Sequence, residues 1–80
     1  SDEIKVFPNP ATDFIQIQSI QNANNLKVDF LDILGKVISC EVDVKDDNTI
    51  NINTSNITKG FYFIRITDRN RMKTFKVKIN

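Results

Sequence analysis

The sequence contains no histidine and a single cysteine, Cys40, among its 80 residues. One cysteine cannot form a disulfide within the chain, and without histidine there is no Cys/His set of zinc ligands. Nucleophilic catalysis usually needs a base beside the nucleophile, most often histidine, so Cys40 and the serines lack their normal partner. These absences argue against an enzyme and against a zinc-stabilised fold.

Tryptophan is also absent, and there are only two glycines and two prolines, which excludes collagen-like and Pro/Gly-rich low-complexity chains. No apolar run approaches the about 20 residues of a membrane-spanning helix. No basic segment followed by an apolar stretch opens the chain, so we expect no export signal at its N-terminus. Apolar residues make up 40% and charged residues 26%, which indicates one globular domain covering residues 1–80.

Apolar and polar residues alternate along most of the chain with the period of two that is typical of β-strands. The alternation is clearest in five segments, at residues 15–18, 26–30, 38–42, 50–53 and 74–79. A nearly continuous apolar run at residues 61–66 predicts a central strand buried on both faces. No segment has the spacing of an amphipathic helix. The pattern predicts an all-β fold, a small immunoglobulin-like antiparallel β-sandwich of about seven strands.

Connecting segments are predicted from a few individual residues. Gly35 permits a tight turn because it adopts positive φ without steric cost. A hairpin turn is expected at residues 68–71, where Asn70 can take the left-handed conformation. The polar loop at residues 53–60 includes one apolar residue, Ile57, which we expect to anchor it to the core.

The alternation places Ile38, Cys40 and Val42 on the inward face of their strand. We therefore expect Cys40 to be a small core hydrophobe rather than a reactive thiol. The six phenylalanines fall mostly on inward positions or in apolar runs, as Phe61 and Phe63 do. That placement argues against nucleic-acid binding by base stacking, and against a sugar-binding face with exposed aromatic rings.

Two short patterns in the chain have little specificity. Asp43, Asp46 and Asp47 could bind calcium, but the spacing of an EF-hand is absent and Asp-rich turns often bond their own backbone. We expect no metal site there. The N-glycosylation acceptor pattern occurs at residues 53–55 and 56–58, but this pattern is frequent by chance and suits an ordinary polar loop.

Charge is distributed unevenly along the chain. Residues 65–80 contain six basic residues and one acidic residue, a net charge of +5, whereas residues 1–64 contain five basic and nine acidic residues, a net charge of −4. A basic terminal hairpin can attract an acidic partner or an anionic surface. Lysines on an exposed strand also protect a sheet edge from aggregation, and an exposed edge allows a strand-mediated dimer.

Four motifs follow one another along the chain, at residues 6–13 (VFPNPATD), 30–37 (FLDILGKV), 57–66 (ITKGFYFIRI) and 73–78 (KTFKVK). In this order and spacing they resemble the type A C-terminal sorting domain of the type IX (Por) secretion system, found in secreted proteins of the Bacteroidetes. The resemblance covers about residues 4–80. It departs from the family pattern at Ile57, where leucine is usual, and at Asn70, where glycine is usual.

The resemblance implies a non-catalytic signal domain without a cofactor, at the tail of a larger secreted precursor whose cargo domain lies N-terminal to it. Its expected partners are the outer-membrane translocon and a sortase-like protease that removes the domain in many members. The expected route is through the periplasm to the cell surface or the medium. An accessory β-sandwich module for carbohydrate binding or adhesion remains the alternative.

The resemblance also assigns roles to particular residues. Because the last strand and its lysine-rich end matter most for export in the family, the expected recognition residues are its outward side chains, Lys73, Thr74, Lys76 and Lys78. The other motif residues are expected to be structural: the prolines fix extended geometry, the glycines permit turns and the tyrosine fills the core. This structural set comprises Pro8, Asn9, Pro10, Asp32, Gly35, Gly60 and Tyr62.

Overall fold

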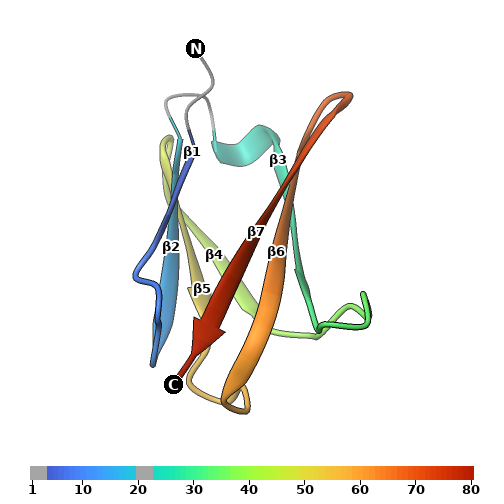
Figure 1. Ribbon diagram of the computed structural model, residues 1–80. Coiled ribbons are helices and arrows are strands. Elements are labelled where there is room, and N and C mark those ends of the chain that lie inside the picture. Colours follow the sequence, from blue (N-terminus) through green and yellow to red (C-terminus); the bar gives the residue numbers. More distant parts are fainter. Residues whose placement is uncertain (1–3, 20–22) are drawn as a thin grey trace.

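The computed structural model describes residues 4–19 and 23–80, which form two β-sheets packed face to face (Figure 1). Within these residues, no helix is long and apolar enough to cross a membrane. The elements are β1 (Ile4–Phe7), β2 (Phe14–Ser19), the 3-10 helix η1 (Ala23–Asn25), β3 (Leu26–Leu31), β4 (Glu41–Asp46), β5 (Thr49–Asn53), β6 (Gly60–Asp68) and β7 (Arg71–Ile79).

The two sheets differ in size. The first has four strands in the order β1-β2-β5-β4, and the second has three in the order β3-β6-β7. Every neighbouring pair of strands is antiparallel. The prediction of a small antiparallel β-sandwich of about seven strands is therefore confirmed.

The core lies between the sheets and consists mainly of β-branched side chains, which suit a pleated surface. Each inward-facing side chain of a strand alternates with an outward one, so both sheets contribute every second residue. The large apolar side chains with at most 2% of their surface exposed are Ile15, Ile17, Phe30, Ile50, Ile52, Ile64, Ile66, Val77 and Ile79. Burial of each large side chain contributes about 1.5–3 kcal/mol to folding, before the entropy lost on ordering the chain.

Strand β6 is central in the second sheet, as the apolar run predicts, but it is not buried on both faces. Ile64 and Ile66 point into the core, whereas Phe61 on the opposite parity is 50% exposed. No further layer formed by the described residues covers the outer face of this sheet, which leaves that face solvated. Tyr62 points inward and is half-buried. Its ring stacks on Phe30 with centroids 5.1 Å apart.

The turn after β3 is held by Asp32 and includes Gly35 at φ +86°. One carboxylate oxygen of Asp32 accepts hydrogen bonds from the backbone N–H groups of Leu34 and Lys36, both at 2.9 Å. Leu31, just before the turn, is buried and forms an isolated antiparallel bridge to Val37. This bridge and the hydrogen bond from the Ile38 N–H to the Phe30 carbonyl pair the end of β3 with the segment after the turn.

The hairpin between β6 and β7 differs from the prediction in one detail. Arg69, not Asn70, has positive φ, at +57°. In a two-residue hairpin loop, positive φ at the first central position alone is the pattern of a type II′ turn. The expectation that Asn70 supplies the left-handed residue is therefore wrong, because the position it occupies in this turn does not require that conformation.

The segment around Cys40 also differs from the prediction. Strand β4 begins only at Glu41, so Ile38 and Cys40 precede it in an irregular stretch, where both are half-buried. Val42 and Val44 have inward parity, yet they are 41% and 47% exposed. The inward parity predicted for Val42 is therefore present, but it does not bury the side chain, because β4 is the edge strand of the wider sheet and the smaller sheet leaves its valines uncovered.

Candidate functional site

The terminal strand β7 is an edge strand of the second sheet, and its side chains divide between two faces. Thr74, Lys76 and Lys78 point outward and are exposed, while Val77 and Ile79 are buried in the core. Lys73 has the opposite parity from these three outward residues, and its ammonium lies 5.9 Å from the ring centroid of Phe75. The structure therefore brings three of the four predicted recognition residues together and places Lys73 apart from them.

Phe61 lies beside these lysines on the outer face, directly opposite Lys78 in the sheet register. The ammonium of Lys76 is 4.8 Å from the centroid of its ring, and that of Lys78 is 5.9 Å away. Cation–π contacts at exposed sites contribute about 0.5–1 kcal/mol each. They hold two positive charges around one exposed aromatic ring. We call Phe61, Lys76 and Lys78 the basic-aromatic face.

The sequence reasoning missed Phe61 because it assigned the whole apolar run to the core. Arg65 provides the missing signal, since Phe61, Phe63 and Arg65 share one parity and a charged member indicates a solvated face. Arg65 is paired across strands with Asp29, with 3.0 Å between Nη2 and Oδ2. This pair neutralises Arg65, whereas neither Lys76 nor Lys78 forms an ion pair within the described ranges.

The other phenylalanines also depart from the prediction that most would be buried. Only Phe30 is fully buried, while Phe7 and Phe14 are 36% and 43% exposed. The cross-strand register places Phe7 opposite Gln16, so Phe7, Phe14 and Gln16 share the outer face of the first sheet. The argument against base stacking and sugar binding that rested on buried phenylalanines is therefore wrong.

Residues 8–11, between β1 and β2, run along the edge of β7, and we call them the strap. Both X-Pro peptide bonds in this segment, Phe7-Pro8 and Asn9-Pro10, are cis. The side-chain amide of Asn9 donates to the carbonyl of Lys76 at 3.1 Å, and its oxygen accepts from the N–H of Lys78 at 2.9 Å.

The backbone of the strap continues the same pairing. The Ala11 N–H donates to the Lys78 carbonyl, and the Asn80 N–H donates to the Ala11 carbonyl, both at 2.8 Å. Ala11 itself is 1% exposed. The strap thus occupies the edge of β7 along the same residues whose side chains form the basic-aromatic face. The Pro-Asn-Pro motif and the lysine-rich end, which are far apart in sequence, meet here.

Gly60 and Tyr62 lie at the start of β6. Gly60 has φ +148°, in a region that other residues rarely adopt, and it pairs with Ile79 at the end of β7. The Tyr62 hydroxyl donates to the carbonyl of Thr58 at 2.6 Å, which ties the preceding loop to the strand. In that loop Ile57 packs against the core, as predicted. These contacts give Gly60 and Tyr62 positions where they shape the fold.

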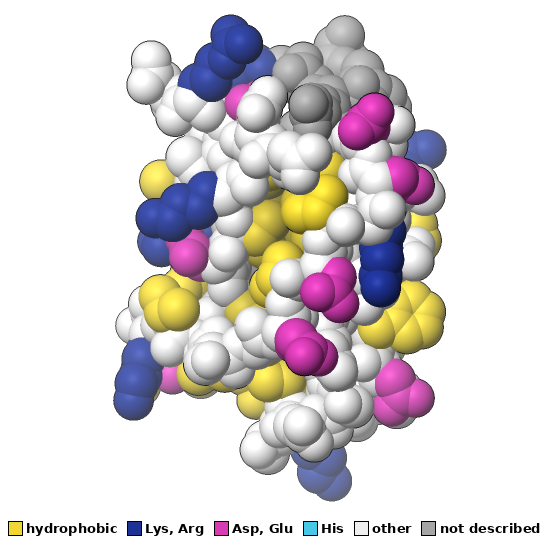
Figure 2. Space-filling view, turned by 180° about the vertical axis from the view of Figure 1, so that it is seen from behind, with side chains coloured by type: hydrophobic (Ala, Val, Ile, Leu, Met, Phe, Trp, Pro, Cys, Tyr) yellow, Lys and Arg dark blue, Asp and Glu magenta, His cyan; other side chains and the backbone are white. Residues whose placement is uncertain are grey.

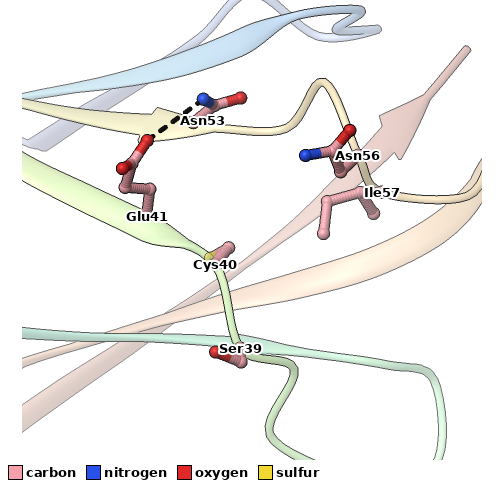
Figure 3. A pocket seen from close by; sticks show the side chains of 6 residues that line it. All are labelled: Ser39, Cys40, Glu41, Asn53, Asn56 and Ile57. Atoms are coloured by element: carbon pink, nitrogen blue, oxygen red, sulfur yellow. Dashed lines mark hydrogen bonds between the residues drawn. The ribbon is translucent and has the colours of Figure 1, made fainter.

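A shallow surface hollow of about 470 Å³ lies where β4 and β5 meet the loop before β6, and Figure 3 shows the six side chains that line it. Its residues are Ser39, Cys40, Glu41, Asn53, Asn56 and Ile57. The Asn53 amide donates to the Glu41 carboxylate at 3.3 Å. Burial raises the pKa of the Cys40 thiol, which disfavours the nucleophilic thiolate. Among the residues of known placement, no three His, Cys, Asp or Glu side chains gather as metal ligands would.

The chain is similar to known proteins over almost its whole length. Residues 5–80 match the family described as the secretion system C-terminal sorting domain. An endo-acting ulvan lyase from Formosa agariphila is 33% identical over 76 residues, which cover 95% of this chain. The chain spans only 14% of the length of that lyase, so the similarity concerns one segment of a much longer protein.

Proposed function

The chain belongs to the family of secretion system C-terminal sorting domains, a non-catalytic family, and we propose that its basic-aromatic face is what the type IX secretion machinery recognises. The supporting observation is the grouping of Lys76 and Lys78 around the exposed ring of Phe61. A complementary partner surface would present an apolar side chain flanked by carboxylates. Such charge complementarity mainly speeds encounter and excludes wrong partners.

The strap determines how this surface can be approached. Recognition by strand addition needs a free edge, but Asn9 and Ala11 already bond the backbone of β7 at Lys76 and Lys78 and that of Asn80 just after it. A receptor strand could pair there only by displacing the strap. We therefore propose that side chains on the outer face, rather than the backbone edge at this end of β7, make the recognition contacts.

We also propose the route and the partners of the domain. A cargo domain precedes it in a longer precursor, the domain is recognised in the periplasm, and the outer-membrane translocon carries the protein to the cell surface. A sortase-like protease then removes the domain, leaving the cargo at the surface or in the medium. Family membership supports this route. The much greater length of the ulvan lyase supports the proposal that a cargo domain belongs to the same precursor.

Export of a fusion tests the proposal. A fluorescent protein with a signal peptide would be joined to residues 1–80 and expressed in strains with and without the type IX machinery. We expect machinery-dependent export of the wild type. The double variant Lys76→Glu/Lys78→Glu should lose most export, whereas Lys5→Glu/Lys36→Glu, an equal charge change at exposed positions in β1 and in the turn after β3, should retain it.

The outcomes separate the function from the surface. If the wild-type fusion stays folded in the periplasm of both strains, the sorting function itself is wrong. If both double variants are exported equally well, only the assignment of the basic-aromatic face is wrong. The single variant Lys73→Glu then tests whether the fourth predicted residue contributes from its different face.

A second function, carbohydrate binding, is favoured by the outer face of the first sheet. Phe7 and Phe14 are exposed there, and the side-chain amides of Gln16 and Asn51 lie in register beside them. Aromatic rings beside amide donors and acceptors suit a neutral sugar. A glycan array with the wild type and with Phe7→Ala/Phe14→Ala tests this function. Binding that requires the two rings would support it, and an array without hits would exclude it.

A further inference from the structure

The sandwich has an open side, between the edge strands β3 and β4, that contrasts with the side closed by the strap. Each of these two strands ends its sheet, and β4 pairs with β5 alone among the described strands. The N–H of Ala23 in η1 donates to the carbonyl of Asp47, so η1 covers one end of this side. A bulge between Val44 and Asp46 interrupts the ladder. The part of the β4 edge that pairs regularly with β5, and that no other described strand covers, is therefore residues 41–44.

Apolar side chains line this open side. Val42 and Val44 lie in register with Ile52 and Ile50, which are at most 1% exposed, yet the two valines are 41% and 47% exposed. Half-buried side chains of β3 and of the segment before β4 continue the surface. Figure 2 shows a band of hydrophobic side chains down the middle of this face, with acidic side chains along one rim. Contiguous exposed apolar surface on a small domain often marks an interaction site.

The rim of the open side is acidic. Glu41 and Asp43 lie on the outer face of β4, and Asp46 and Asp47 follow beyond the bulge, all of them exposed. Lys45 is the basic residue of β4, and its ammonium is 3.8 Å from the Asp43 carboxylate. Charged side chains, bulges and charges that point inward all protect strand edges from aggregation. Here the inward positions hold valines, which leaves the edge able to pair.

We propose that residues 41–44 of β4 accept an extended segment of a partner protein in which apolar and basic side chains alternate. The segment would add as a fifth strand to the first sheet, with its backbone bonded to the free edge of β4. Because side chains of a strand alternate between faces, its apolar residues would cover Val42 and Val44 while its basic residues lie beside Glu41 and Asp43. This surface lies on the opposite side of the sandwich from the strap.

Two peptides test the proposal directly. The first has the sequence of residues 72–80 of this chain, which alternates apolar residues with lysines, and the second has glutamate at its three lysine positions. Each would be titrated into the 80-residue protein while backbone amide signals are followed by NMR. We expect the lysine peptide to shift the signals of β4 and of the facing part of β3. We expect it to bind at least about tenfold more tightly than the glutamate peptide.

Variants then sharpen the assignment. Glu41→Lys/Asp43→Lys should reverse the preference, so that the glutamate peptide becomes the tighter ligand. Val42→Thr/Val44→Thr keeps the side-chain shape and should lower the affinity for the lysine peptide severalfold. Asp13→Lys is the control, because it replaces one acidic side chain by lysine at an exposed residue before β2, two strands away from β4. It should leave the preference for the lysine peptide in place.

Four results would overturn the proposal. The first is equal affinity for the two peptides, and the second is a set of signal shifts confined to β7 and the strap. The third is no binding at about 1 mM peptide, because even a weak specific contact is measurable at that concentration. The fourth is concentration-dependent dimerisation of the wild type, abolished by Glu41→Lys/Asp43→Lys. That result would assign this edge to a second copy of the chain instead of a separate partner.

Discussion

Strands β4 and β7 are both edge strands with alternating apolar and polar residues, yet their inward side chains end in opposite environments. Val77 in β7 is 1% exposed, whereas Val44 in β4 is 47% exposed. Their outward charges also differ in sign, since lysines lie on β7 while Glu41 and Asp43 lie on β4. The same sequence pattern therefore produces a core strand on one side of the sandwich and an open surface on the other.

The two strands differ in exposure because other parts of the chain cover β7 but leave β4 open. Strand β7 packs beside the central strand β6, and the strap fills its edge through Asn9 and Ala11. Strand β4 has β5 on one side, and across from it the second sheet ends at β3. A side chain gains from burial only where another layer removes it from water, so inward parity alone does not create a core position. The following predictions test this contrast, from the largest effect to the smallest.

Truncation of the inward side chains should destabilise β7 far more than β4. We expect Ile79→Ala to lower the free energy of unfolding by about 2–4 kcal/mol, because it leaves a cavity at a fully buried site. Val44→Ala should cost less than about 1 kcal/mol, since water already reaches that side chain. Urea denaturation of both variants measures the difference. Similar losses would mean that the open side is covered in solution.

Removal of the Asn9 side chain should loosen the edge of β7. Asn9→Ala deletes two hydrogen bonds to the backbone of Lys76 and Lys78, each with a net value of about 0.5–1.5 kcal/mol. The N–H of Lys78 loses its acceptor, so its hydrogen exchange should accelerate more than that of its neighbours in β7. Asn51→Ala, an amide on the outer face of the first sheet, is the control. Unchanged exchange at Lys78 would contradict the pairing by the strap.

A substitution at one position of the hairpin that leads into β7 should stabilise the protein. Arg69→Gly relieves the left-handed backbone of Arg69 and should raise the free energy of unfolding by up to about 1 kcal/mol. Asn70→Gly should bring no such gain, because Asn70 does not have positive φ. Thermal denaturation of the two variants decides between the positions. A larger gain from Asn70→Gly would restore the prediction made from the sequence.

The smallest expected effect concerns Cys40, beside the open side. Burial raises the pKa of its thiol, so the folded state favours the protonated form more than the unfolded state does. Its contribution to stability is complete below the ordinary pKa of a thiol and declines as the pH rises toward the raised value. Wild-type stability should therefore fall more steeply than that of Cys40→Ala in this alkaline range. If the stabilities of the two proteins fell equally with pH, burial would not raise the pKa of the Cys40 thiol.

Local patterns in the sequence were sufficient to predict the strand content, the sandwich architecture and the central place of β6. The period of two is a property of extended backbone, so it is visible in residues 15–18 and 74–79 without any knowledge of the fold. The resemblance based on four ordered motifs was also sufficient for the family. The patterns did not predict that Phe61 and Val42 are exposed. Burial depends on whether another layer lies above a strand, and no local pattern contains that information.

By itself, the sequence determined which segments extend, which residues turn and how charge divides between the acidic first part and the basic hairpin. Only the tertiary structure decided that Asn9 meets Lys76 and Lys78, that Phe61 joins them on an outer face, and that Val42 and Val44 remain exposed. Those facts depend on which strand becomes an edge and what lies across from it. Such neighbours are set by packing between residues far apart in the chain, and alternation along a single strand does not encode them.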